Sequence, residues 1–190
     1  MKIGIFDSGF GGLTVFKEIK KAMPEYDYIY LGDSARAPYG NHSHDIIYKY
    51  VEEAVEFLFN QDCQLVILAC NTASAQALRK LQQGWLAENY PNRRVLGVIR
   101  PIAEYAADLG QDKKIGVIGT RATISSGSYE NELKKLGDDS IQIISQACPL
   151  LVPLIEEGFD KRPETKRILK YYLRPLRQNG VDILIQGCTH

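Results

Sequence analysis

No long hydrophobic run occurs in this sequence. No apolar stretch approaches the roughly 20 residues that cross a bilayer as a helix. The N-terminus passes from Met1-Lys2 directly into a strand-like stretch, without the longer apolar region of a signal peptide. These absences argue against a membrane protein and against secretion, so we expect a cytoplasmic protein.

An excess of charge of one sign is also missing. The 190 residues include 23 basic and 23 acidic side chains, so no net field attracts nucleic acid or an anionic membrane. A local charged patch remains compatible with this balance. We therefore expect a small-molecule ligand, with neither nucleic acid nor a membrane as a partner.

Cysteine is scarce, and nucleotide-binding signatures are absent. The four cysteines, at 63, 70, 148 and 188, lack both the density of a secreted disulfide scaffold and the C-x-x-C spacing of a zinc site, which predicts reduced thiols and no metal. A G-x-G-x-x-G motif would need glycine where Thr14 stands, and G-x-x-x-x-G-K-[ST] does not occur. NAD and ATP are therefore not expected as ligands.

Short apolar runs alternate with longer helical patterns along the chain. The runs are mostly apolar throughout, as in strands covered on both faces, which favours parallel pairing. The predicted strands are 2–6, 28–31, 65–68, 94–98, 114–118, 141–145 and 181–185. The predicted helices are 12–22, 44–60, 73–89, 101–109, 126–136, 149–157 and 164–178. This order predicts the α/β fold class, with mainly parallel central sheets flanked by helices.

The chain also repeats itself. "KIGIFDSG" at 2–9 resembles "KIGVIGTR" at 114–121, and "VILACNT" at 66–72 resembles "ILIQGCT" at 183–189, in the same order. Coincidence between such short strings is the alternative. Pro101 disfavours helical geometry in the residue before it, so a joint is expected around 98–101. We therefore expect two related α/β domains, 1–97 and 98–190.

Unusual polar groups follow several predicted strands, where open α/β sheets bind ligands. Asp7 and Ser8 begin a glycine-rich loop, and they either contact a ligand or cap a helix. Cys70 precedes Asn71 and Thr72, which are able to cap the next helix, and a helix N-terminus favours a thiolate. A buried inert thiol is the common alternative, which we expect for the other two cysteines at 63 and 148.

Cys70 and Cys188 together suit a two-base racemase. One thiolate removes a proton from one face of a carbon while a thiol supplies a proton to the opposite face, and the roles exchange in the reverse direction. The competing interpretation is a nucleophilic Cys/His enzyme with His190 as the base beside Cys188. That interpretation leaves Cys70 without a role.

Six strings in order and spacing resemble the glutamate racemases of the aspartate/glutamate racemase superfamily. They are "GIFDSGFGG", "YLGDSARAPYG", "ACNTASA", "GTRATISSGSYE", "ACPLLVPLIEEG" and "GCTH", and they span the whole chain. The resemblance implies interconversion of L- and D-glutamate without a cofactor, for peptidoglycan and cell-wall synthesis. It also implies a cytoplasmic enzyme of two pseudo-symmetric α/β domains, with the active site in the cleft between them, and a homodimer.

The resemblance also implies roles for particular residues. Cys70 and Cys188 match the catalytic cysteines, and His190 matches the residue that assists the second one. Asp33 and Glu156 match acidic residues near the family's site, with a merely structural role as the alternative for each. The matched substrate-binding positions are Asp7, Ser8, Tyr39, Gly40, Asn71, Thr72, Thr120, Thr123, Thr189 and His190, and Asp7 and Glu156 also count as catalytic candidates.

Two departures from the family pattern keep alternatives open. Gln186 stands where an apolar residue is usual, and family members continue for several tens of residues beyond His190, in a segment that completes the first domain. One alternative is another amino-acid or hydantoin racemase of the superfamily. The other is a truncated, non-catalytic fragment or binding protein. The choice of glutamate over aspartate rests on the resemblance alone.

Overall fold

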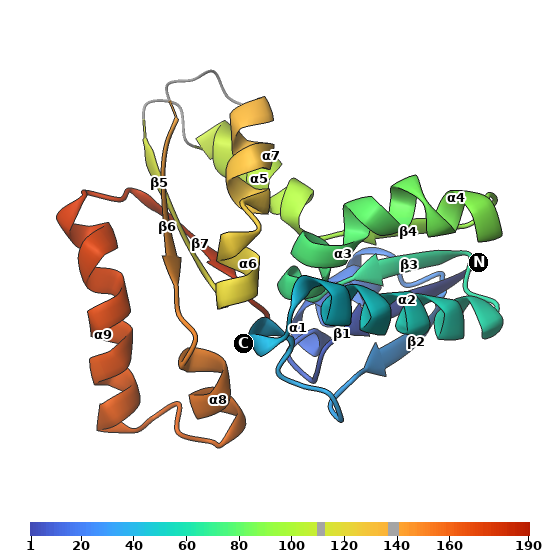
Figure 1. The fold of residues 1–190 in the computed structure, drawn as a ribbon, viewed down its shortest axis with the longest axis horizontal. Helices are drawn as coiled ribbons and strands as arrows, with labels where there is room; N and C mark the ends of the chain where they lie inside the picture. Colours follow the sequence, from blue (N-terminus) through green and yellow to red (C-terminus); the bar gives the residue numbers. More distant parts are fainter. Residues whose placement is uncertain (110–112, 137–140) are drawn as a thin grey trace. The chain divides into compact units, whose positions relative to one another are not determined.

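The computed structural model describes residues 1–109, 113–136 and 141–190 (Figure 1). By its internal contacts, the chain divides into two units. Unit 1 comprises Met1–Val98 together with Thr189, and unit 2 comprises Ile99–Cys188 together with His190. Each unit contains one parallel sheet flanked by helices, which confirms the predicted α/β class.

Unit 1 is built on a four-stranded sheet of order β2-β1-β3-β4, in which every neighbouring pair is parallel. Its strands are β1 Lys2–Asp7, β2 Asp27–Gly32, β3 Leu65–Leu68 and β4 Arg94–Gly97. Its helices are α1 Leu13–Ala22, α2 His44–Asn60, α3 Asn71–Gln83 and α4 Trp85–Asn89, with the short 3-10 helix η1 Tyr39–Asn41.

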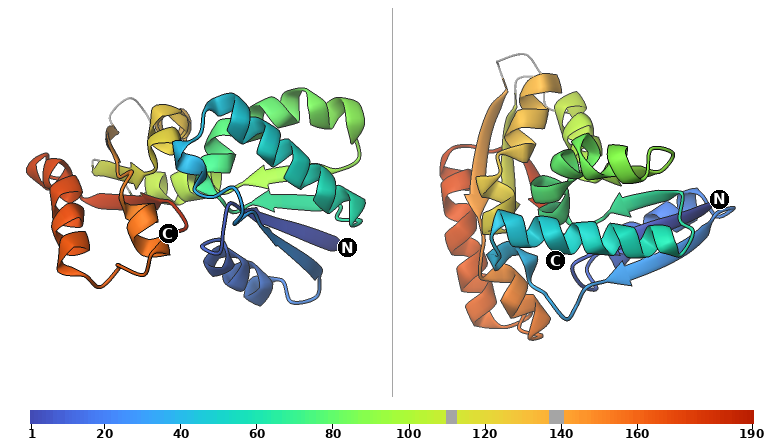
Figure 2. Two further views of the ribbon diagram at one scale, coloured as in Figure 1. Left: turned by 60° about the horizontal axis from the view of Figure 1, so that its bottom comes forward. Right: turned by 45° about the vertical axis from the view of Figure 1, so that its right-hand side comes forward.

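The two faces of this sheet are covered by different helices (Figure 2). Ile3 and Ile5 point to one face, where Phe16 of α1 packs against them. Gly4 lies on the opposite face, where a Cβ atom would sit 3.0 Å from the Leu58 side chain of α2. The missing side chain lets α2 approach the central strand closely.

Unit 2 is built on a three-stranded parallel sheet of order β6-β5-β7. Its strands are β5 Lys114–Gly119, β6 Gln142–Ala147 and β7 Ile183–Gly187. Its helices are α5 Ile99–Leu109, α6 Arg121–Ser125, α7 Ser128–Leu136, α8 Leu151–Glu156 and α9 Pro163–Gln178. Helices α5 and α7 pack together on one side of the strands, and α9 lies on the other side (Figure 1). In the part of the chain that the structure describes, no helix is long and apolar enough to cross a membrane.

The two sheets repeat one pairing register. The strand that precedes the cysteine starts opposite the second residue of the central strand in each unit, with the pairs Ile3–Leu65 and Ile115–Ile183. Cys70 follows Leu65 by five positions, and Cys188 follows Ile183 by five positions. The two cysteines therefore occupy equivalent places in their own sheets, as the repeated strings predict.

Two local expectations were wrong. The single helix expected over 73–89 is divided into α3 and α4 at Gly84, and helix α6 was not predicted. The boundary between the two units falls between Val98 and Ile99, within the joint expected at 98–101, and Pro101 lies in the first turn of α5. Proline is tolerated there because the first N–H groups of a helix have no partner within the helix.

Truncation of Ile5 tests the packing of unit 1. Its side chain is fully buried in the cluster on β1, so we expect Ile5→Ala to lower the free energy of unfolding by about 2–5 kcal/mol. Leu96→Ala on β4 is the control, because its side chain is 51% exposed and its loss should cost less than about 1 kcal/mol. Urea denaturation measures both, and equal losses would contradict the assigned core.

Candidate active site

The thiol of Cys70 lies buried between a strand end and a helix start. Cys70 is the N-cap of α3, and its Sγ accepts a hydrogen bond from the Ala73 N–H at 3.4 Å. Its Sγ also lies 3.4 Å from the Ser8 hydroxyl oxygen, to which the thiol donates. The sequence suggested Asn71 or Thr72 as the cap. The cysteine itself has this role, because Asn71 is already the first residue of α3.

Asp7, the last residue of β1, has no solvent exposure. Its Oδ1 accepts a hydrogen bond from the Gly9 N–H at 3.0 Å, and its Oδ2 accepts one from the Thr189 hydroxyl at 3.2 Å. Gly12 packs so tightly here that a Cβ atom would lie 2.4 Å from the Asp7 Cβ. Asp7 does not cap α1, because the N-cap position is Gly12 and no side chain hydrogen-bonds there.

The loop between β2 and α2 is hydrogen-bonded to the end of β1. The Asp33 N–H donates to the Asp7 carbonyl at 3.0 Å. Tyr39 and Gly40 are both buried, and the Tyr39 hydroxyl donates to Asp33 Oδ2 at 2.5 Å. Burial, then that hydrogen bond, raises the pKa of Tyr39, and a charge on Cys70 acts in the same direction. The Tyr39 hydroxyl is therefore held as a neutral donor to Asp33.

In unit 2, two threonines lie just after β5, Thr120 in the turn and Thr123 inside helix α6. Thr120 is the N-cap of α6, and its hydroxyl oxygen accepts from the Thr123 N–H at 3.1 Å. The two hydroxyl oxygens are 3.0 Å apart, and both residues are buried. The turn follows β5 as the Asp7–Ser8 turn follows β1, so hydroxyl groups are available at this strand end too.

Cys188 follows β7 and lies near an imidazole that also contacts a carboxylate. The Cys188 Sγ is 4.0 Å from His190 Nδ1, and His190 Nε2 is hydrogen-bonded to Oε1 of Glu156 at the end of α8. Interaction with Cys188 raises the pKa of His190 to about 9, with Glu156 contributing, despite the opposing effect of burial. The raised pKa favours the imidazolium form of His190, which lies between the Cys188 sulfur and the Glu156 carboxylate.

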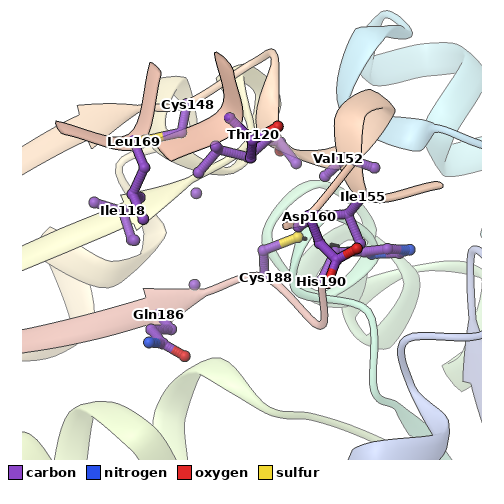
Figure 3. A pocket seen from close by; sticks show the side chains of 14 residues that line it. Ile118, Thr120, Cys148, Val152, Ile155, Asp160, Leu169, Gln186, Cys188 and His190 are labelled. Atoms are coloured by element: carbon purple, nitrogen blue, oxygen red, sulfur yellow. Dashed lines mark hydrogen bonds between the residues drawn. The ribbon is translucent and has the colours of Figure 1, made fainter. Parts of the chain in front are cut away.

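A cavity of about 240 Å³ in unit 2 opens onto this group (Figure 3). Cys188 and His190 lie at one part of its wall, and Ile118 and Leu169 line another. Cys148 also lines it, and burial raises the pKa of that thiol to about 11, so it stays protonated and unreactive. The cavity places apolar surface next to the Cys188 thiol.

The structure thus groups the predicted site residues by unit. Those in unit 1 are Asp7, Ser8, Tyr39, Gly40, Cys70, Asn71, Thr72 and Thr189. Those in unit 2 are Thr120, Thr123, Glu156, Cys188 and His190. Whether the two groups act on one ligand stays a prediction. Within residues 1–109, 113–136 and 141–190, no set of three or more His, Cys, Asp and Glu side chains is placed to hold a metal ion.

Sequence reasoning missed two residues of interest. Arg36 binds Asp33 in the loop before Tyr39, and the one available signal was a guanidinium two positions before the Pro-Tyr-Gly turn. Asp160 lines the cavity of unit 2. The sequence around it contains no motif that would have marked it as a site residue.

Fold and site together define a class: a two-unit α/β protein with a cysteine after the corresponding strand of each parallel sheet. The sequence profile described as Asp/Glu/Hydantoin racemase matches residues 3–190, and the chain belongs to that family. This finding confirms the resemblance drawn from the six sequence strings.

Named relatives and solved structures agree with this assignment. The chain is 50% identical over 191 residues to a glutamate racemase of Sulfurihydrogenibium sp. (strain YO3AOP1), with 100% of this chain and 71% of the relative covered. A glutamate racemase of Aquifex aeolicus (strain VF5) is 47% identical over 190 residues, with the same coverage of 100% and 71%.

Among solved structures, a glutamate racemase isoform from Bacillus anthracis matches with a TM-score of 0.90 and 40% identity, covering 99% of this chain and 68% of that one. A glutamate racemase from Francisella tularensis in complex with D-glutamate matches with a TM-score of 0.89 and 38% identity, covering 100% and 68%.

The charge on His190 can be measured directly. We expect its imidazole signals in NMR spectra to titrate with a midpoint near 9, and the midpoint to fall furthest in Cys188→Ala and less in Glu156→Gln. The folded protein holds this proton more tightly than the unfolded chain, so the His190 proton contributes to the free energy of unfolding. This contribution is complete below pH 6.5, the usual pKa of histidine, and is lost as the pH rises towards 9. A midpoint near 6.5 in the unmodified protein would contradict this assignment.

Proposed function

We propose that this chain interconverts L- and D-glutamate. The observation that carries the proposal is the equivalent placement of Cys70 and Cys188, each at the carboxyl end of the strand paired with the central strand of its unit. Glutamate is favoured as the substrate because the relatives named above are glutamate racemases, one of them solved with D-glutamate.

The proposed reaction uses two bases and no cofactor. One cysteine, as a thiolate, takes the proton from Cα on one face, while the other, as a thiol, gives its proton to the opposite face. The first sulfur ends as a thiol and the second as a thiolate, so the enzyme is left ready for the reverse reaction. In one direction Cys70 is the base, and in the other Cys188 is.

Each sulfur has neighbours that suit this task. The Ala73 N–H at the start of α3 donates to the Cys70 Sγ, and such a donor favours negative charge on sulfur. His190, whose raised pKa favours the imidazolium, lies beside the Cys188 Sγ, and Glu156 is hydrogen-bonded to the other ring nitrogen. We therefore assign His190 an assisting role and Glu156 a positioning role.

The carbanion-like state also needs stabilisation. The α-proton of an amino-acid carboxylate is far less acidic than a thiol, and each unmatched pKa unit adds about 1.4 kcal/mol to the cost of deprotonation. The candidate donors are the hydroxyls of Ser8, Thr72 and Thr189 and the backbone N–H groups after β1 and β3, preorganised in a water-poor site. Asp7 holds Thr189 and the following turn, so we assign it an orienting role.

The biological part of the proposal follows the family. D-Glutamate made in the cytoplasm would supply peptidoglycan synthesis, and a homodimer would be the working form. The alternative substrates are those of other members of the superfamily, namely another amino acid or a hydantoin.

Circular dichroism of purified protein tests the substrate. We incubate L-glutamate, L-aspartate and a substituted L-hydantoin separately and follow the optical signal with time. The proposal predicts that the L-glutamate signal decays to zero, faster than either of the others. Faster decay with aspartate or hydantoin would favour the other racemases, and no decay with any of the three would favour a non-catalytic fragment.

Removal of either thiol tests the mechanism. We expect Cys70→Ala and Cys188→Ala each to lower the rate by at least 10²-fold, because general acid–base groups contribute about 10²–10⁴-fold. Asp7→Asn should be less severe. Cys63→Ala is the matched control, because Cys63 is buried in the connection between α2 and β3 and has no role in the proposal. A residual rate above about 1% in either active-site variant would contradict the paired-thiol assignment.

A further inference from the structure

Arg36 joins the loop after β2 to helix α2. Its Nε donates to Asp33 Oδ2 at 2.6 Å, and its terminal nitrogen donates to Glu53 Oε2 on α2, also at 2.6 Å. The guanidinium carbon lies 4.1 Å from the centre of the Tyr50 ring, again on α2. One planar cation thus binds a loop carboxylate, a helix carboxylate and an aromatic face, a combination suited to arginine rather than lysine.

The carboxylate held by Arg36 also holds Tyr39. The same Asp33 Oδ2 accepts the Tyr39 hydroxyl at 2.5 Å, and the Asp33 side chain is only 10% exposed. A largely buried carboxylate needs compensation for its charge, which the guanidinium supplies. Without Arg36, we expect the Asp33 side chain to move towards water, and the Tyr39 hydroxyl to lose a fixed acceptor.

Tyr39 in turn positions the backbone beside the candidate site. Its buried ring packs against the Phe6 ring of β1 with the centroids 6.0 Å apart, and it begins η1, which contacts α3. Cys70 is the N-cap of α3. The Asp33 N–H donates to the Asp7 carbonyl, so the loop is fastened to the site at its start as well as at Tyr39.

A second contact braces the turn itself. The Arg36 carbonyl is 3.1 Å from His42 Nε2, and the His42 and Tyr50 rings meet edge to face. The loop therefore depends on Arg36 through both its side chain and its backbone. Glu53 and the Arg36 side chain are 46% and 33% exposed, so the ion pair between them contributes little to stability. Arg36 therefore matters mainly because it fixes the positions of Asp33 and Tyr39.

We infer that Arg36 is a positioning residue for substrate binding. By fixing Asp33 and, through it, Tyr39, it holds the Tyr39-Gly40 backbone in the conformation that binds glutamate. The inference rests on the proposed function, because Tyr39 and Gly40 are substrate-binding positions only within that proposal. Arg36 itself is not assigned contact with the substrate.

Steady-state kinetics separates this role from a purely structural one. We expect Arg36→Gln to raise the KM for L-glutamate by about tenfold or more and to change kcat by less than about threefold, because small displacements of binding groups have large effects. Arg36→Lys should rescue part of the loss, since an ammonium reaches one carboxylate but cannot form the planar fork. The double variant Asp33→Asn/Arg36→Gln should have a KM no higher than that of the worse single variant, because both substitutions break one connection.

Arg100→Gln is the matched control. Arg100 also pairs with two carboxylates, those of Glu104 and Glu132, but it holds none of the predicted site residues. We expect its KM and kcat to match those of the unmodified protein. An unchanged KM in Arg36→Gln, or the same change in Arg100→Gln, would overturn the inference while leaving the proposed function intact.

Hydrogen exchange tests the positioning without any turnover. Amides of residues 34–41 should exchange about tenfold faster or more in Arg36→Gln and at an unchanged rate in Arg100→Gln, because the loop loses its attachment to α2. Unchanged exchange in Arg36→Gln would overturn the inference even if the protein failed to racemise glutamate. That failure in the unmodified protein would instead count against the proposed function.

Discussion

Parallel pairing of β1 and β5 with their neighbours is the constraint on which the other features depend. It brings the carboxyl ends of the strands in each sheet to one edge, so loops distant in sequence emerge together. The register of the pairing decides which residues reach that edge and which face of the sheet their side chains point to. A shift of one residue would turn every side chain to the opposite face. Cys70 and Cys188 occupy equivalent places because both flanking strands start in the same register.

Small residues at these strand ends let buried polar groups find partners. A Cβ atom at Gly32 would lie 2.6 Å from the Gly9 carbonyl oxygen, and one at Gly11 would lie 2.7 Å from the Thr189 hydroxyl oxygen. The resulting close approach allows Asp7 to be fully buried with both carboxylate oxygens hydrogen-bonded. A buried carboxylate without such partners would be strongly destabilising. The glycines therefore allow a buried charge to be hydrogen-bonded, in addition to permitting close packing.

Much of the fold was predictable because buried parallel strands are continuous apolar runs. The predicted bounds of β3 and α2 agree with the structure, and the two thiols do follow strands. The contacts of Arg36 with Glu53 and Tyr50, and of His190 with Glu156, were not predictable, because they join residues far apart in sequence. The cap of α3 was also missed, since sulfur is a less usual acceptor there than the side chains of Asn71 or Thr72.

The central claim is that two thiols share one reaction, and isotope incorporation tests it most directly. L-Glutamate is racemised in D₂O, and Cα deuterium is measured early in both enantiomers. If one cysteine abstracts the proton and the other donates a deuteron taken from solvent, the new D-glutamate carries deuterium at Cα while the remaining L-glutamate keeps hydrogen there. When the reaction starts from D-glutamate, the new L-glutamate should carry the deuterium. The thiols must exchange with solvent before each turnover. Under that condition, early product that carries mainly hydrogen rather than deuterium at Cα, in either direction, would contradict the two-thiol account.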